Sequence, residues 1–302
     1  MGFRNQMIKL FTSRIRHTSV AAAMLLSGFA GCEYGGGAVL VPEVTIVPAD
    51  FSGDSLESSS SPEAAPSQAA TSGASELGSV VGRVVLDGSF EALTPLHSAG
   101  ADVKDKEVCA KFDTPDERLV LGADNGVANV FVYMQKAPKG TQSLNAADQE
   151  LIFDQQYCRF LPHCLVVPTG STVKVLSNDT VAHNTHSYPN KNQGVNSGVA
   201  PGDREGKLRI TYNRAEAEPI AVKCDYHSWM NAYHLPIDHA FAAVTDKDGN
   251  FEISGLPAGE HVFAIWHEAA SGKFVERKLA VQVASGDATP IEIKYAVSKL
   301  DL

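Results

Sequence analysis

The sequence predicts an all-β protein built from β-sandwiches, and three observations support this fold class. From residue 79 onward, short runs of β-branched and aromatic residues recur between Gly, Pro, Asn and Asp. No long stretch of the chain shows the 3.6-residue period of an amphipathic helix. The 302 residues, 44% of them hydrophobic, are enough to bury one or two cores. Many short strands at this spacing indicate sandwiches.

The first 32 residues predict a bacterial lipoprotein signal peptide. Basic residues up to Arg16 precede an apolar stretch that is too short to span a bilayer. This stretch ends in Phe29-Ala30-Gly31-Cys32, which resembles a lipobox whose cysteine receives the lipid; cleavage without lipidation is the alternative. We therefore expect an exported protein of the cell envelope, in the periplasm or on the outer surface, anchored to the membrane through Cys32.

Residues 33–78 predict a disordered tether, because a segment rich in Gly, Ser, Pro and Ala cannot bury a core. The charge balance limits the partners of the whole chain. Acidic residues number 35 against 25 Lys and Arg, which gives a net charge of −10. Because nucleic-acid binding needs a basic face, we expect no nucleic-acid partner.

The β-type runs after the tether fall into three segments, 79–150, 151–237 and 238–302. Expected strands lie at 80–86, 127–134, 165–167, 172–176, 208–212, 220–223, 241–245, 251–253, 261–266, 278–283 and 291–295. Segments 79–150 and 238–302 either form one sandwich, interrupted by 151–237, or belong to sandwiches that follow one another along the chain. The runs themselves fit both arrangements.

Residues 245–263 contain an Asp-Gly pair flanked by alternating residues and then Leu256-Pro257-Ala258-Gly259. Asp-Gly supplies the positive φ of a tight hairpin. The stretch resembles the carboxypeptidase regulatory-like (transthyretin-like) sandwich family, which implies such a sandwich for residues 238–302. A calcium loop is the rival interpretation for Asp246, Asp248 and Asn250. Pro257 stands where an EF-hand needs its Glu, so we expect a turn.

The five cysteines have different expected roles. Cys32 receives lipid, and Cys224 lies in the metal motif described below. If Cys158 and Cys164 share one extended segment, they lie about 20 Å apart, too far for a disulfide. Either of them could pair with Cys109. We favour Cys109–Cys158, because Cys164 lies in an apolar run that suits a buried thiol.

Metal chemistry is indicated by Cys224-Asp-Tyr-His227-Ser-Trp-Met230, which places a thiolate, an imidazole and a thioether within seven residues. On one strand Cys224 and His227 would face opposite sides, so a tight loop is expected here. A trigonal His₂Cys site with a weak axial Met needs a second imidazole. His183 is the candidate. His186, three residues further, would point away from the same ion if the segment is extended.

The combined pattern resembles the blue copper proteins of the amicyanin and plastocyanin type, or cupredoxins, over about 80 residues. The matching motifs are Pro162, Val166-Val-Pro-Thr-Gly-Ser-Thr-Val173, His183-Asn184-x-His186 and Cys224-x₂-His227-x₂-Met230. The resemblance implies a Greek-key sandwich at 151–237 that binds one copper ion through His183, Cys224, His227 and Met230. It also implies that Asn184 ties the two ligand segments together, and that electrons pass at the His227 edge.

We expect a blue copper electron carrier that exchanges electrons with a redox partner protein in the envelope, with Trp229 as a possible point of electron uptake. A copper storage or delivery protein is one alternative. A structural or carbohydrate-contacting sandwich with incidental metal is another, and zinc could replace copper in a Cys/His₂ set. No catalytic motif is found in the sequence, so we do not expect an enzyme. Six further histidines suit either hydrogen bonding or a second metal site: His163, His186, His234, His239, His261 and His267.

Overall fold

The computed structural model describes residues 77–144 and 146–302, so the predicted signal peptide, Cys32 and most of the tether lie outside the described residues. The protein is all-β, as predicted. Its strands are β1 (Leu77–Asp87), β2 (Phe131–Tyr133), β3 (Glu150–Gln155), β4 (Phe160–Leu161), β5 (Cys164–Pro168), β6 (Thr172–Val175), β7 (His183–Ser187), β8 (Asn196–Val199), β9 (Leu208–Thr211), β10 (Ile220–Lys223), β11 (Asn231–Ile237), β12 (Ala242–Val244), β13 (Asn250–Pro257), β14 (Gly259–Trp266), β15 (Phe274–Val283) and β16 (Ala288–Ala296).

The helical elements in this part of the chain are short. One α-helical turn, α1 (Lys106–Cys109), is accompanied by the 3₁₀ turns η1 (Ala123–Asn125), η2 (Ser271–Lys273) and η3 (Val297–Lys299). Between residues 77 and 302, the described helices are too short and too polar to cross a membrane.

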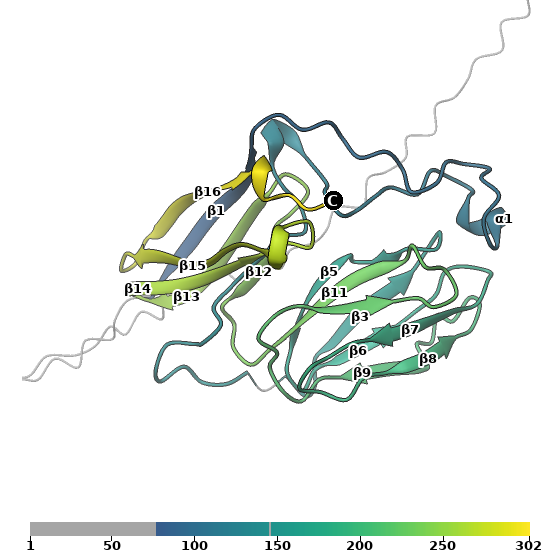
Figure 1. Cartoon of the computed structure of the whole chain (residues 1–302). Coiled ribbons are helices and arrows are strands. Elements are labelled where there is room, and N and C mark those ends of the chain that lie inside the picture. The colour runs from purple at the N-terminus through teal and green to yellow at the C-terminus, as the bar shows by residue number, and fades with distance from the viewer. Residues whose placement is uncertain (1–76, 145) are drawn as a thin grey trace, which may run out of the picture. The chain divides into compact units, whose positions relative to one another are not determined.

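One sandwich combines strands from both ends of the described chain. Its two sheets have the strand orders β13-β1-β16 and β12-β2-β14-β15. β1 pairs antiparallel with β13 and parallel with β16, so the first described strand lies between two strands from the C-terminal part (Figure 1). Segments 79–150 and 238–302 thus share one sandwich. Apolar residues of both sheets, among them Val84, Ile253, Phe263 and Ile293, form its core.

The second sandwich is inserted between those two segments and contains strands β3 to β11. Its sheets have the orders β5-β11-β10-β7-β8 and β4-β3-β6-β9. Their inward faces share one core that includes Phe153, Val175, Ile210 and Val222. The alternation of buried and exposed residues along β6 and β10 places every second side chain in this core.

A third apolar cluster lies between the two sandwiches. In β2, Val132 belongs to the core of the first sandwich, while Phe131 and Tyr133 belong to the third cluster. Because successive strand residues point to opposite faces, all three residues of β2 are buried. Leu235 and Ile237 of β11 complete the cluster from the second sandwich. These contacts explain why β2, and the second half of β11, are buried on both faces.

The Asp-Gly stretch forms a turn, as the sequence predicts. The Asp246 carboxylate accepts hydrogen bonds from the backbone N–H groups of Asp248 and Asn250, at 2.9 and 2.8 Å. Gly249 has a φ of 84°, which a residue with a side chain rarely adopts. The carboxylate therefore organises the turn itself, which is the ordinary structural use of this motif.

Candidate metal centre

The Cys224–Met230 segment forms a closed loop between two paired strands. β10 ends at Lys223 and β11 begins at Asn231, and these two residues are partners in the antiparallel pair. Within the loop, the Cys224 N–H donates to the Met230 carbonyl at 3.2 Å, and the Met230 N–H donates to the His227 carbonyl at 2.9 Å. The chain turns between Cys224 and His227 as their spacing requires, so both side chains face the same interior.

The first residue of β7 brings the second imidazole to this loop. β7 pairs with β10, with His186 opposite Lys223, which places His183 near the loop. The His183 Nδ1 and His227 Nδ1 atoms lie 3.0 Å apart, and the Cys224 Sγ atom lies 3.8 Å from the His227 Nδ1 atom. Donor atoms of the three residues all lie within 4.8 Å of one another. The structure thus brings together residues that are 44 positions apart in sequence.

All four predicted ligand residues are buried. The exposed fraction is 0% for His183 and His227, 1% for Met230 and 2% for Cys224. Met230 and Cys224 belong to the same apolar cluster as the core of the second sandwich. A donor set enclosed in this way is shielded from water, which favours a fixed coordination geometry.

Each imidazole is oriented by a carboxylate on its other nitrogen. The His183 Nε2 atom is 2.9 Å from Asp179 Oδ2, and the His227 Nε2 atom is 2.9 Å from Asp105 Oδ2. Since a carboxylate only accepts, each Nε2 must carry the hydrogen, and each Nδ1 then presents a lone pair to the centre. Carboxylate–histidine pairs of this kind fix the tautomer of metal-binding histidines and raise their basicity.

The charge state of the sulfur also suits a metal. Burial alone would raise the pKa of Cys224, but hydrogen bonds from His183, His227 and nearby backbone N–H groups lower it to about 6. Burial likewise disfavours a charged His183, yet Asp179 and the Cys224 sulfur raise the pKa of that imidazole. The lowered pKa favours a thiolate at this position, and the thiolate is the form of cysteine that binds a metal ion.

The spacing of the donors agrees with this interpretation. In zinc proteins, nitrogen ligands lie about 2.0 Å and thiolate ligands about 2.3 Å from the metal ion. Two nitrogens 3.0 Å apart and a sulfur 3.8 Å from one of them can satisfy such bonds together. Without a cation, two nitrogen lone pairs and a thiolate would face one another inside a core, which is unfavourable. The residues present thus fit a bound metal ion.

Asn184 connects the two ligand segments. Its Oδ1 atom accepts a hydrogen bond from the Asp225 backbone N–H at 2.6 Å, and its Nδ2 group donates to the Asp225 carboxylate at 2.9 Å. Asp225 directly follows Cys224, one of the predicted ligands. His186, on the opposite face of β7, lies near the surface and contacts Asp225 and Tyr188 instead of the centre. Of the two histidines on β7, only His183 is in the donor group.

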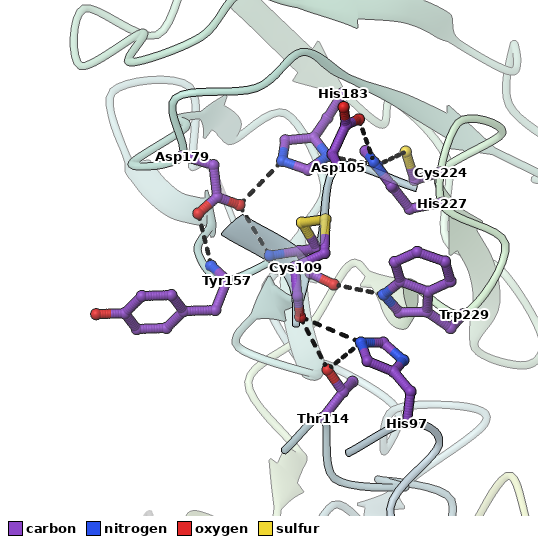
Figure 2. The surroundings of a disulfide bond; sticks show 11 residues. His97, Asp105, Cys109, Thr114, Tyr157, Asp179, His183, Cys224, His227 and Trp229 are labelled. Atoms are coloured by element: carbon purple, nitrogen blue, oxygen red, sulfur yellow. Dashed lines mark hydrogen bonds and ion pairs between the residues drawn. A yellow bond between two sulfur atoms is a disulfide. The ribbon is translucent and has the colours of Figure 1, made fainter. Parts of the chain in front are cut away.

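A segment that lies outside the expected strands covers the centre. We call residues 96–114 the cap segment; its ends are held together by backbone hydrogen bonds between residues 96–97 and Thr114. It supplies Asp105, α1 and Cys109, which forms a disulfide with Cys158 (Figure 2). Because the Asp105 carboxylate contacts the imidazole of His227 and this side chain is fully buried, the His227 edge does not lie at the surface. The passage of electrons at this edge stays a prediction.

Trp229 lies beside the covered histidine. Its ring centroid is 5.3 Å from that of His227 and 4.8 Å from that of His97, in the cap segment. The indole N–H donates to the Cys158 carbonyl at 3.2 Å. Three aromatic rings thus form a chain from the donor group to the half-buried His97.

Asp105, Asp179 and His97 belong to the surroundings of the centre, but no motif in the sequence marks them. Asp179 lies four residues before His183. This spacing brings two side chains together on a helix, but the segment was expected to be extended, so it gave no signal. Asp105 lies 122 residues before His227, and His97 lies more than 120 residues before Trp229. No local pattern could have connected them.

The remaining cysteine and histidines lie outside the donor group. Cys164 is a buried free thiol on β5, and burial raises its pKa well above the ordinary value. His163 pairs with Glu268 of the other sandwich, and His234 contacts the Tyr212 hydroxyl. Within residues 77–144 and 146–302, the clusters of three donor residues that could hold a metal ion all contain His183 or His227. The described residues thus give no second site built from the other histidines.

No protein-family model and no curated protein sequence matches this chain. Several solved structures resemble part of it. A copper-containing nitrite reductase from Thermus scotoductus is 17% identical, with a TM-score of 0.27, over 34% of this chain and 25% of its own. This chain therefore spans about a quarter of the length of that reductase.

Two smaller proteins match over nearly their whole length. A purple cupredoxin from Nitrosopumilus maritimus is 21% identical, with a TM-score of 0.24, over 30% of this chain and all of its own. Amicyanin from Paracoccus versutus is 15% identical, with a TM-score of 0.23, over 36% of this chain and 99% of its own. At these TM-scores the likeness carries no argument about function, so the case for a metal rests on the buried donor atoms of His183, Cys224 and His227.

Proposed function

We propose that this protein binds one copper ion through His183, Cys224, His227 and Met230 as a type 1 (blue) site, and that it carries single electrons. The observation that carries the proposal is the buried donor group, in which Nδ1 of two histidines and one low-pKa sulfur face each other. Their opposite nitrogens are already bound to carboxylates. Each of the two histidines therefore has one ring nitrogen, Nδ1, left to bind a metal ion.

Copper suits this donor group better than zinc does. Zinc and copper both accept thiolate and imidazole, but a thioether is a soft donor that suits copper and is not a usual zinc ligand. Met230 is tied by backbone hydrogen bonds to both Cys224 and His227, within the same loop. A loop that holds Cys, His and Met together therefore favours copper.

Bound copper would supply a change between Cu(I) and Cu(II). The protein's contribution is to keep the donors fixed while that change occurs. Hydrogen bonds hold both imidazoles, and Asn184 holds the loop against β7. A rigid, buried site reorganises little on reduction, and a site with four protein ligands offers no open position to a substrate. We therefore propose an electron carrier and not an enzyme.

Electrons would reach the site through Trp229. Asp105 covers the Nε2 edge of the His227 ring, whereas the Trp229 ring contacts both His227 and the half-buried His97. A redox partner protein of the envelope would then dock near His97. The lipobox-like sequence before Cys32 supports an envelope location, and the disulfide between Cys109 and Cys158 suits an oxidising compartment.

A copper-delivery role is less well supported. Delivery requires that ligands reach a partner protein, but all four ligand side chains are buried and the cap segment covers His227. We therefore retain the electron carrier as the proposed function.

The test is the visible and paramagnetic-resonance spectrum of the purified protein after addition of Cu(II). Wild-type protein should show an intense thiolate-to-copper band, and Cys224→Ser should lose it. Cys164→Ser is the matched control, because Cys164 is the other buried free thiol and lies outside the donor group. A colourless wild-type protein, or a band that survives Cys224→Ser, would reject the proposed function.

A further inference from the structure

Asp179 is a buried carboxylate held in place by three hydrogen bonds (Figure 2). Its Oδ1 atom accepts the backbone N–H of Tyr157 at 2.6 Å, and its Oδ2 atom accepts the backbone N–H of Cys158 at 2.8 Å. The same Oδ2 atom lies 2.9 Å from Nε2 of His183. Successive backbone N–H groups that converge in this way form a concavity that binds an anion. Asp179 is therefore fixed against the imidazole by the main chain.

The backbone that supplies these two N–H groups has an uncommon conformation. Tyr157 and Cys158 have φ angles of 52° and 53°, and Asp105, the carboxylate on the other imidazole, has a φ of 53°. Such values persist outside glycine only where the surrounding structure imposes them. The disulfide joins Cys158 to Cys109, which lies in the cap segment together with Asp105. Three of the seven non-glycine residues with positive φ in the described part of the chain thus serve the two carboxylates.

The two carboxylates face histidines and not Lys or Arg side chains. Among the described residues, the ion pairs of Asp179 and Asp105 are those with His183 and His227. Each histidine presents its other nitrogen to the centre, so both negative charges act through an imidazole on an ion bound there. The Asp179 side chain is 3% exposed and that of Asp105 is 36% exposed. Water therefore screens the charge of Asp179 less than that of Asp105.

We propose that Asp179 is a positioning residue that makes the centre selective for a metal ion of charge +2 over one of charge +1, and that Asp105 does the same to a smaller extent. The attraction between a carboxylate and a cation scales with the charge of the cation, so it is about twice as strong for a divalent ion. For copper, this favours Cu(II) over Cu(I). That consequence for copper rests on the proposed function, whereas the selectivity for charge does not require a blue site.

The selectivity bears on the direction in which electrons pass. Reduction of the centre takes one electron from the redox partner and lowers the charge of the copper ion from +2 to +1. The carboxylates oppose this change, because backbone hydrogen bonds keep Asp179 in place whatever the charge of the ion. They therefore lower the reduction potential of the centre. The reduced protein would then give its electron readily to an acceptor protein.

The test compares the affinities of the purified protein for two ions of different charge. Zn(II) and Cu(I) are titrated anaerobically against chelators of known affinity, with wild-type protein and with Asp179→Asn. Asparagine keeps the shape of aspartate and one oxygen that accepts hydrogen bonds, but it carries no charge. We expect the Zn(II) affinity to fall by about 10–100-fold and the Cu(I) affinity to fall by a smaller factor. Voltammetry of the copper-loaded variant should show a higher reduction potential than that of wild-type protein.

Asp203→Asn is the matched control, because Asp203 also accepts backbone N–H groups but contacts no imidazole. It should leave both affinities unchanged. Equal losses for both ions in Asp179→Asn would show that the side chain only maintains the structure, and would overturn the proposal. An unchanged Zn(II) affinity would do the same.

Asp105→Asn provides a second measurement at a more exposed side chain. It should show the same preferential loss of Zn(II), with a smaller ratio between the two ions, and it decides the question if Asp179→Asn does not fold. A wild-type protein without a blue band that still shows the preferential loss would reject the proposed function and support this inference. A wild-type protein that binds neither ion would reject both.

Discussion

The Asp105 carboxylate lies 2.9 Å from Nε2 of His227, a residue 122 positions further along the chain. This contact joins the cap segment to the loop that carries the predicted ligands Cys224, His227 and Met230. It also helps to bury the imidazole edge of His227, where the sequence predicts that electrons pass. Asp105 itself has a φ of 53°, an uncommon backbone conformation outside glycine. Asn tolerates this conformation better than most residues, which makes Asp105→Asn a suitable probe.

Asp105→Asn should weaken copper binding. The substitution keeps the shape of the side chain but removes the charge that fixes the His227 tautomer. Loss of such a carboxylate partner lowers metal affinity by about 10–100-fold. Competition with a copper chelator would measure the change. Asp102→Asn is the control, because Asp102 is exposed and pairs with Lys106 alone. Equal losses in both variants would contradict the role assigned to Asp105.

Cys224 should be a thiolate at neutral pH in the copper-free protein. Burial raises its pKa, but hydrogen bonds from His183 and His227 lower it to about 6. Because the folded-state pKa is below the ordinary value of 9.0, the thiolate form contributes stability above pH 9 that is lost as the pH falls through about 6. Thiolate absorbance in the ultraviolet, followed against pH, measures this pKa.

Cys164 and Cys224, the two free cysteines between residues 77 and 302, provide an internal comparison for that titration. The change near pH 6 should disappear in Cys224→Ser and persist in Cys164→Ser, since burial raises the pKa of Cys164 well above the ordinary value. A midpoint for Cys224 at the ordinary pKa of a thiol would show that the imidazoles do not stabilise its charge.

Glu268→Gln should destabilise the contact between the two sandwiches. Glu268 of the first sandwich binds His163 of the second, and both side chains are buried. Removing one partner of a buried ion pair leaves an uncompensated charge and costs about 3–5 kcal/mol. Denaturant unfolding would measure this. Glu218→Gln is the control: its partner Arg277 is 3.8 Å away and both are exposed, so the effect should stay below about 1 kcal/mol.

The destabilisation caused by Glu268→Gln should also depend on pH. Burial lowers the pKa of His163, but the hydrogen bond to Glu268 and the charges of Glu268 and Glu117 raise it above 6.5 overall. The contribution of the charged pair is therefore complete below pH 6.5 and is lost as the pH rises through the raised pKa of His163. The difference between wild type and Glu268→Gln should shrink in alkaline solution. A difference that grows with pH would contradict a charged His163.

Trp229→Leu should slow electron exchange while leaving the reduction potential nearly unchanged. The Trp229 ring lies between His227 and His97, and it is not itself a donor to the metal. Trp229→Phe keeps an aromatic ring and is the matched variant. Stopped-flow reduction measures the rate, and voltammetry measures the potential. If Leu and Phe variants exchange electrons at the wild-type rate, electrons enter elsewhere.

The elements of the fold that the sequence predicts are those with local patterns. Every expected run of β-type residues overlaps a strand, although the run at 127–134 contains only the three residues of β2. β3, β4, β7, β8 and β11 were not expected. β8 (Asn196–Val199) is rich in small polar residues, and it is a strand because its partner β7 fixes its backbone. Pairing partners therefore decide strands that propensity does not.

The sequence by itself determined the ligand loop, since Cys224, His227 and Met230 lie within seven residues whose spacing forces a turn. It also indicated His183 and the outward direction of His186, because the period of a strand is local. Only the tertiary structure decided that Asp105 and the Cys109–Cys158 disulfide enclose that loop. These contacts join residues about 50 to 120 positions apart, and their formation depends on how the two sandwiches and the cap segment pack. No short-range pattern encodes such a contact, because its energy comes from burial and pairing that exist only in the folded chain.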